Sequence, residues 1–200
     1  MAPPLQLRFV MSAPDVTSLP ETAVEVAVVG RSNVGKSSLI NAMANQTRLA
    51  QTSKTPGRTR LLNLFELADG SGAVVDLPGY GYAAAPRHMR SKWPKMIEDY
   101  LLTRPQLVRT LVLVDGEIGP TKLDVTMLEW ARGHDLPITV VATKHDKVKS
   151  SKRERRKDDL ASGCGLARSD IVWVSAAKGT GIDKLQGHVR ACLSGRDADG

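Results

Sequence analysis

Residues 30–37 have the composition and the spacing of a loop that binds phosphate groups. They fit the pattern G-x-x-x-x-G-K-S/T, and the segment with its following residue comprises Gly30, Arg31, Ser32, Asn33, Val34, Gly35, Lys36, Ser37 and Ser38. Backbone N–H groups of such a loop surround nucleotide phosphates, while Lys36 reaches the β and γ phosphates and the Ser37 hydroxyl binds Mg²⁺. A glycine-rich turn with a solvated lysine is the alternative. The β-branched run before Gly30 and the helical pattern after Gly35 favour the phosphate loop, which requires a strand and a helix on its two sides.

A carboxylate and a glycine follow the apolar run that ends at Val75. They belong to a D-x-x-G element formed by Asp76, Leu77, Pro78 and Gly79. At the carboxyl end of a strand near the phosphate loop, we expect Asp76 to hold Mg²⁺ through water and the Gly79 N–H to sense the γ phosphate. Alone, a D-x-x-G string more often marks a turn, but the upstream phosphate loop favours the nucleotide role.

The segment after the apolar run at residues 138–142 predicts which base is bound. Thr143, Lys144, His145 and Asp146 resemble the N/T-K-x-D element of GTPases, with Thr in place of the commoner Asn. A carboxylate at Asp146 can accept hydrogen bonds from N1–H and from the exocyclic amine of guanine, whereas adenine presents an acceptor at N1. The alkyl stem of Lys144 is expected to lie over the base. A solvated basic turn is the alternative, and Asp146 argues against an ATP-binding protein of the same class.

The residues after the last apolar run are expected to complete the base site. Val174, Ser175 and Ala176 begin a segment that resembles the S-A-x-K element of GTPases. A backbone amide of that element contacts the guanine oxygen. The pattern is degenerate by itself, and the elements that precede it support the interpretation.

A turn between the phosphate loop and a predicted hairpin supplies one more candidate Mg²⁺ ligand. It contains Gly57, Arg58 and Thr59, at a place where a mobile loop can bring a threonine to Mg²⁺ when the γ phosphate is present. A plain solvated turn is the alternative. The predicted catalytic residues are thus Lys36, Thr59 and Gly79, and the predicted Mg²⁺ ligands are Ser37, Thr59 and Asp76.

Strands and helices alternate along the chain as a nucleotide-binding sheet requires. The predicted strands are residues 24–29, 61–67, 73–75, 111–114, 138–141 and 171–174, with a hairpin turn at 69–72. The predicted helices are residues 36–45, 88–102, 121–132, 151–161 and 182–193. The sequence therefore predicts the three-layer α/β fold of P-loop NTPases. We expect a mostly parallel six-stranded sheet, one antiparallel strand and helices on both faces.

Length and composition indicate one soluble domain. We place it at residues 23–194, with an N-terminal extension at 1–22 and a tail at 195–200, both expected to be partly disordered. No apolar run approaches the roughly 20 residues of a membrane span, and no secretory signal is evident. Two cysteines are too few for a disulfide framework, so we expect a cytoplasmic protein, with a monomer as the default. The net charge of +7 favours polyanionic partners such as nucleic acid.

Three residue strings extend the similarity to one family. Residues 30–41, 53–59 and 76–83 closely resemble those of the EngB proteins, small bacterial GTPases with the Ras-like fold of the translation-factor class. The similarity spans about residues 24–193. The resemblance implies binding of GTP and GDP with Mg²⁺, slow hydrolysis of GTP, and a switch function in assembly of the large ribosomal subunit. It also implies a link to cell division and septation.

Three positions bear on how far this resemblance extends. Tyr80 stands where many GTPases carry the glutamine that orients the attacking water, so intrinsic hydrolysis should be slow. Asn33 matches a residue that helps to hold an activating K⁺ in related GTPases, and a side chain bonded to its own loop is the alternative. Glu117 stands two residues after Asp115, where relatives often carry an arginine, which leaves the role of this loop open.

Two basic stretches are candidate contacts with ribosomal RNA. The first flanks Trp93 and contains Arg87, Arg90, Lys92 and Lys95. The second, residues 144–157, holds eight Lys or Arg residues, and a solvated helix face is its alternative reading. Two functions therefore stay open. One is an enzyme that cycles between GTP and GDP, and the other is a nucleotide-gated module that binds RNA or the ribosome and hydrolyses GTP only incidentally.

Overall fold

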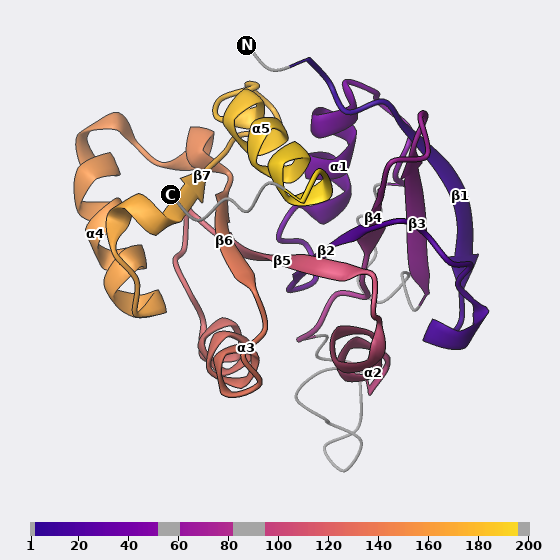
Figure 1. Ribbon diagram of the computed structural model, residues 1–200. Coiled ribbons are helices and arrows are strands. Elements are labelled where there is room, and N and C mark those ends of the chain that lie inside the picture. Colours follow the sequence, from indigo (N-terminus) through magenta and orange to yellow (C-terminus); the bar gives the residue numbers. More distant parts are fainter. Residues whose placement is uncertain (1–2, 52–60, 82–94, 196–200) are drawn as a thin grey trace.

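A central sheet is covered by helices on both of its faces (Figure 1). The structure is a computed structural model, and it describes residues 3–51, 61–81 and 95–195. Within these ranges the strands are β1 (Leu7–Ala13), β2 (Glu25–Gly30), β3 (Leu62–Leu67), β4 (Ala73–Asp76), β5 (Leu107–Asp115), β6 (Ile138–Thr143) and β7 (Ile171–Trp173). The α-helices are α1 (Lys36–Ala44), α2 (Lys95–Thr103), α3 (Lys122–Gly133), α4 (Arg153–Cys164) and α5 (Ile182–Leu193). Short 3-10 helices lie at Val16–Ser18, His145–Lys147, Ser150–Lys152 and Arg168–Asp170.

The strand order in the seven-stranded sheet is β1-β3-β4-β2-β5-β6-β7. Neighbouring strands from β4 to β7 pair in parallel, whereas β3 runs antiparallel to both β1 and β4. This arrangement confirms the predicted α/β fold with a mostly parallel sheet and one antiparallel strand. The predicted number of six strands is wrong, because β1 adds a seventh.

The additional strand lies within residues 1–22, which the sequence predicts as an extension outside the domain. It pairs with β3 along its whole length, with a bulge between Phe9 and Met11. As an edge strand it buries only Leu7 and Ala13, at its two ends, so the alternation that marks a half-buried strand is weak. This part of the predicted extension therefore belongs to the folded sheet.

The two faces of the sheet have separate cores. Helices α1 and α5 cover one face, and α2, α3 and α4 pack on the other (Figure 1). Every residue of β2 is buried, with Val26 and Val28 facing α1 and α5 while Ala27 and Val29 face the opposite helices. Burial on both faces explains the continuous apolar run of this strand. It also holds the carboxyl end of β2 firmly between two helical layers.

The parallel strands end at one edge of the sheet. Their register places Gly30 beside Leu113 and Asp115 beside Thr143, and Asp76 beside Val28. The loops that follow β2, β4, β5, β6 and β7 therefore leave the sheet together. In open α/β sheets this is the edge where ligands bind.

Candidate nucleotide-binding site

The predicted phosphate loop connects the carboxyl end of β2 to the first turn of α1. Asn33 and Gly35 have left-handed backbone angles in this loop, with φ values of 65° and 108°. A Cβ built at Gly35 would meet no atom of the described residues within 4 Å, apart from its chain neighbours, so the backbone angle is what requires a glycine. The loop leads directly into the amino end of α1, where backbone amides and the helix dipole favour an anionic group.

The D-x-x-G segment lies directly against this loop. A Cβ at Gly79 would lie 3.0 Å from Ser32 Oγ and 3.1 Å from the Ser32 backbone, so the close approach favours a glycine. The Ser32 N–H donates to the Tyr80 carbonyl oxygen at 2.9 Å, and the Tyr80 N–H donates to the Gly30 carbonyl at 3.3 Å. Leu77, within the same segment, is buried. The residue predicted to sense the γ phosphate is thus adjacent to the loop predicted to hold it.

Asp76 is a buried carboxylate at the end of β4, with 3% of its surface exposed. Its Oδ1 lies 3.9 Å from Lys36 Nζ, and no polar atom of the described residues hydrogen-bonds to that oxygen. Burial raises the pKa of Asp76 to about 6, and the Lys36 charge and the Asn63 side chain only partly oppose this shift. A nearby cation would stabilise such a carboxylate.

These residues fit the Mg²⁺ that the two motifs imply. Asp76 offers a carboxylate oxygen with an unused hydrogen-bonding capacity, and Ser37 offers a hydroxyl from the first turn of α1. Mg²⁺ prefers hard oxygen ligands, and it commonly takes one or two protein groups together with substrate phosphates. The third predicted ligand, Thr59, lies outside the described residues, as do Gly57 and Arg58.

Replacing Asp76 with Asn is expected to stabilise the nucleotide-free protein at neutral pH. Folding raises the pKa of Asp76 from 3.8 to about 6, so its stabilising contribution is present below pH 3.8 and is lost as the pH rises through about 6. The full shift corresponds to about 3 kcal/mol of unfolding free energy above that pH. Thermal unfolding in EDTA over this pH range provides the measurement. The Tm difference between variant and wild type should grow with pH and then level off, whereas a constant difference would contradict the raised pKa.

The segment predicted to recognise the base is fastened to the phosphate loop. The Thr143 hydroxyl donates to the Val34 carbonyl oxygen at 2.7 Å and lies 3.2 Å from the Val114 carbonyl oxygen. The side chain that stands in place of the commoner Asn therefore still joins the end of β6 to the loop after β2.

The carboxylate of Asp146 is oriented by the segment after β7. The Ser175 hydroxyl donates to Asp146 Oδ1 at 2.7 Å and accepts a hydrogen bond from the Lys178 N–H at 3.1 Å. The bond from Ser175 is the main reason that the pKa of Asp146 lies below its usual value. An ionised carboxylate in a fixed orientation is what the two N–H donors of guanine require.

The other predicted base-site residues are brought together through their backbones. The His145 N–H donates to the Val174 carbonyl oxygen at 3.1 Å, and this contact places Val174 to Ala176 beside the N/T-K-x-D segment. The His145 ring packs against Trp173, with ring centroids 5.4 Å apart. His145 thus serves the assembly of the site through its main chain.

Asp115 belongs to this cluster, although the sequence leaves its loop without a role. It ends β5, is 5% exposed, and accepts a hydrogen bond from Lys144 Nζ to its Oδ2 at 2.6 Å. Its Oδ1 accepts from the Glu117 N–H at 2.9 Å, and the Gly116 N–H donates to the Thr143 carbonyl oxygen at 2.9 Å. Asp115 therefore fixes the ammonium group of the lysine that is predicted to lie over the base.

Replacing Asp115 with Asn is expected to weaken binding of GDP and of a GTP analogue by the same factor, about fivefold. The lysine would lose a charge-assisted hydrogen bond, whose value is reduced because the Lys144 side chain is 36% exposed. Competition against a fluorescent guanine nucleotide measures both affinities. Glu117→Gln in the same loop is the matched control, because the Glu117 side chain is exposed. Equal affinities for Asp115→Asn and wild type would show that Lys144 does not depend on Asp115.

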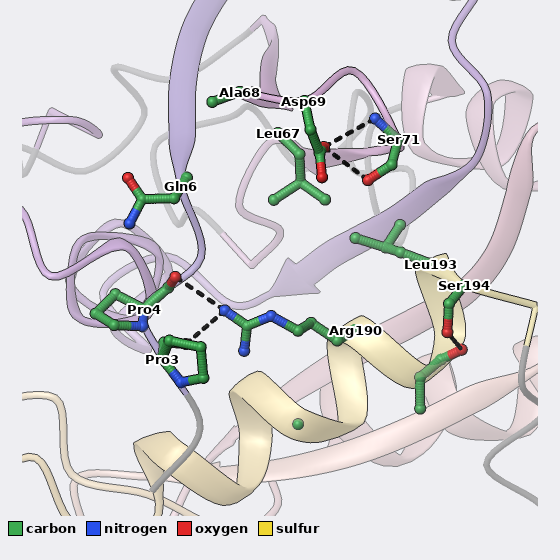
Figure 2. A pocket seen from close by; sticks show the side chains of 12 residues that line it. Pro3, Pro4, Gln6, Leu67, Ala68, Asp69, Ser71, Arg190, Leu193 and Ser194 are labelled. Atoms are coloured by element: carbon green, nitrogen blue, oxygen red, sulfur yellow. Dashed lines mark hydrogen bonds between the residues drawn. The ribbon is translucent and has the colours of Figure 1, made fainter.

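A cavity of about 660 Å³ lies at the end of the sheet opposite the predicted nucleotide site, and Figure 2 shows the residues that line it. It is bordered by α5 and by the turn that joins β3 to β4, and Arg190 donates there to the carbonyl oxygens of Pro3 and Pro4. That turn precedes β4, whereas the predicted nucleotide residues follow the strands. None of the predicted site residues lines the cavity. The motifs thus gather at the carboxyl edge of the sheet and not around this cavity.

In the part of the chain that the structure describes, no three His, Cys, Asp or Glu side chains are grouped so that they could hold a metal ion. No helix in the described ranges has the length and apolar character to cross a membrane. Cys164 and Cys192 are buried free thiols.

Comparisons with known proteins agree with the geometry of the site. Residues 25–144 match the family described as 50S ribosome-binding GTPase. Over 184 residues the chain is 45% identical to the probable GTP-binding protein EngB of Escherichia coli strain K12, and the match covers 90% of this chain and 87% of that protein. The same values hold for the probable GTP-binding protein EngB of Shigella boydii serotype 18.

Solved structures show the same fold. A crystal structure of a probable GTP-binding protein engB matches with a TM-score of 0.67 and 21% identity, over 86% of this chain and 100% of the other. The protein Era, in complex with MgGDPNP and a part of 16S ribosomal RNA, matches with a TM-score of 0.62 and 24% identity, over 87% of this chain and 57% of the other. With its phosphate loop and guanine-type base segment on this fold, the chain belongs to the EngB family of GTP-binding proteins and is a GTPase.

Proposed function

We propose that this GTPase is a nucleotide-dependent switch that acts in the cytoplasm in assembly of the large ribosomal subunit. The observation that carries the proposal is the direct contact of the phosphate loop with Gly79 and Tyr80, because a γ phosphate held by the loop would act first on that segment. The family description, 50S ribosome-binding GTPase, and the net charge of +7 support an RNA-rich partner. The link to cell division and septation is part of the same proposal.

We infer that hydrolysis is an in-line attack of water on the γ phosphate. Lys36 and the amides of the phosphate loop would stabilise the charge that develops on the phosphate oxygens, and the Gly79 N–H would donate to one of them. Ser37, Asp76 and Thr59 are the proposed Mg²⁺ ligands. When bound, Mg²⁺ supplies further positive charge to the β and γ phosphates.

A nucleotide-gated binding module is the second candidate function. It is favoured by Tyr80, whose side chain is 1% exposed and whose hydroxyl donates to Asp124, so the residue at the usual glutamine position is directed into the core. GTP turnover with and without large ribosomal subunits separates the two candidates. A severalfold increase supports the enzyme that cycles, and unchanged turnover with intact binding supports the module.

We also propose that K⁺ activates hydrolysis through Asn33. The left-handed backbone of this residue, with φ of 65°, places it within the turn of the phosphate loop. Turnover in KCl should exceed turnover in NaCl at the same ionic strength. Equal rates in the two salts would contradict the proposal.

Part of the basic stretch at residues 144–157 is exposed, and we infer that this part contacts RNA. Lys147, Lys149 and Lys152 are exposed, and they form no ion pair with the described residues. Within α4, by contrast, Lys157 pairs with Glu154 at 3.0 Å and Arg155 with Asp159 at 3.9 Å. We infer that the three lysines, more than the helix, meet ribosomal RNA. Of the other predicted stretch, Arg87, Arg90 and Lys92 lie outside the described residues.

Charge reversal tests this surface. The triple variant Lys147→Glu, Lys149→Glu and Lys152→Glu should lose co-sedimentation with large ribosomal subunits in the presence of a GTP analogue. The matched control replaces Arg48, Lys122 and Lys184 with Glu, which changes the net charge equally at exposed positions elsewhere. Retained binding by the control supports a specific surface. Equal loss in both variants would mean that total charge alone attracts the subunit.

A further inference from the structure

Asp124, in the first turn of α3, is a fully buried carboxylate outside the nucleotide motifs, with 0% of its surface exposed. Its Oδ2 accepts hydrogen bonds from the Thr121 N–H and from the Thr121 hydroxyl, both at 2.8 Å. Thr121 precedes the helix, and the pair forms a capping box that stabilises the start of α3. The capping box explains the two hydrogen bonds that Asp124 accepts from Thr121, but it explains no other contact of Asp124.

Two further donors reach Asp124 from the nucleotide site. Arg31 Nε, in the phosphate loop, donates to Oδ2 at 3.0 Å, and the Tyr80 hydroxyl donates to Oδ1 at 3.0 Å. Burial, followed by the negative charge of Asp124, raises the pKa of Tyr80, so its hydroxyl stays protonated and remains a donor. A helix cap requires neither of these bonds. Asp124 therefore joins the phosphate loop, the D-x-x-G segment and α3.

The segment beside these donors is the one predicted to sense the γ phosphate. Gly79 packs against Ser32, the Ser32 N–H donates to the Tyr80 carbonyl oxygen, and Gly81 follows with a left-handed φ of 77°. A Cβ at Gly81 would lie 2.9 Å from a side chain of the first turn of α3. The segment thus passes between the loop and α3, on the sheet face opposite α1 (Figure 1). Because Tyr80 follows Gly79 directly in the chain, we expect a displacement of Gly79 to disturb the bond between Tyr80 and Asp124.

We propose that Asp124 is a positioning residue for recognition of the γ phosphate. By holding Tyr80 and Arg31, it keeps the Gly79 N–H beside the phosphate loop and thereby favours GTP over GDP. GDP has no γ phosphate for that amide to contact, so the benefit is confined to the triphosphate. The inference rests on the proposed role of Gly79 and requires no ribosomal partner.

The ratio of the Kd for GDP to the Kd for a non-hydrolysable GTP analogue tests this role. It is measured with Mg²⁺ and without ribosomes. Tyr80→Phe keeps the ring and removes the hydroxyl, while Asp124→Asn keeps the shape and removes the negative charge from the bonds with Tyr80 and Arg31. Each variant is expected to lower the ratio about tenfold, the effect of losing one charge-assisted hydrogen bond. The double variant should lower the ratio by less than the product of the two single effects, because both changes act on the bond between Tyr80 and Asp124.

Thr121→Ala is the matched control for the capping role. It removes the cap hydroxyl and leaves the bonds from Tyr80 and Arg31, so it should lower Tm and leave the ratio unchanged. The proposal is overturned if Tyr80→Phe leaves the ratio at the wild-type value, or if the effects of Tyr80→Phe and Asp124→Asn multiply fully. Tyr80→Phe decides alone if Asp124→Asn does not fold. Ribosome binding is absent from this assay, so failure of the ribosomal proposal would not alter its result.

Discussion

Replacing Asp146 with Asn is expected to weaken GDP binding about 100-fold and to shift the preference of the protein toward xanthine nucleotides. The carboxylate can accept from both N–H donors of guanine, and removing one partner of such buried, charge-assisted bonds costs roughly 2–3 kcal/mol. The amide of Asn can instead donate to the additional oxygen of xanthine. Competition of GDP and its xanthine counterpart against a fluorescent nucleotide measures the change.

Ser175→Ala is the matched control for Asp146→Asn. It removes the hydroxyl that orients Asp146 Oδ1 and leaves the carboxylate in place. This variant should bind GDP more weakly than wild type and retain its preference for guanine. Unchanged guanine selectivity in Asp146→Asn would refute the assignment of the base site.

Replacing Lys36 with Met is expected to weaken GTP binding about 100-fold and to lower kcat at least as much. The ammonium group is predicted to contact the β and γ phosphates, where charge increases in the transition state. The same change removes the cation 3.9 Å from Asp76, so the pKa of that carboxyl should rise beyond about 6. Phosphate release at saturating GTP and equilibrium nucleotide binding are the two measurements.

Lys184→Met, at an exposed position on α5, is the control for loss of a lysine. It should leave binding and turnover at wild-type values. If Lys36→Met hydrolysed GTP as fast as this control, the phosphate loop would not be the catalytic site.

The elements around the motifs could be predicted because their signals are local. The β-branched run of β2 is buried on both faces, and α5 has the bounds predicted for it, Ile182–Leu193. The glycine and lysine of the phosphate loop predict nucleotide binding because they stand at a fixed spacing within a few residues of each other. The roles assigned to the individual site residues remain predictions.

The edge strand β1 could not be predicted in the same way. Its middle residues are exposed or partly exposed, and Phe9 is 50% exposed, so the strand lacks the alternation that burial on one face would impose. What places it in the sheet is its pairing with β3, which is distant in sequence. Such a pairing depends on the whole topology and leaves little trace in the strand itself.

The two carboxylates that organise the site were missed for a related reason. Asp115 meets Lys144 across 29 residues, and Asp124 meets Arg31 across 93. Neither carboxylate belongs to a short motif that binds nucleotide. Each becomes a partner only because parallel strands end at one edge and the first turn of α3 lies beside the phosphate loop. The aspartate three residues after Thr121 was a local signal for a helix cap, and it carried no information about Tyr80.

The affinity of the protein for purified large ribosomal subunits, with a GTP analogue and with GDP, tests the central proposal most directly. Sedimentation at several salt concentrations measures it. We predict binding at least about tenfold tighter with the GTP analogue, because the γ phosphate holds the segment around Gly79 in one arrangement, and this difference should survive moderate salt. Equal binding in the two nucleotide states, lost as salt rises, would contradict a switch and leave only nonspecific attraction of a basic surface to RNA.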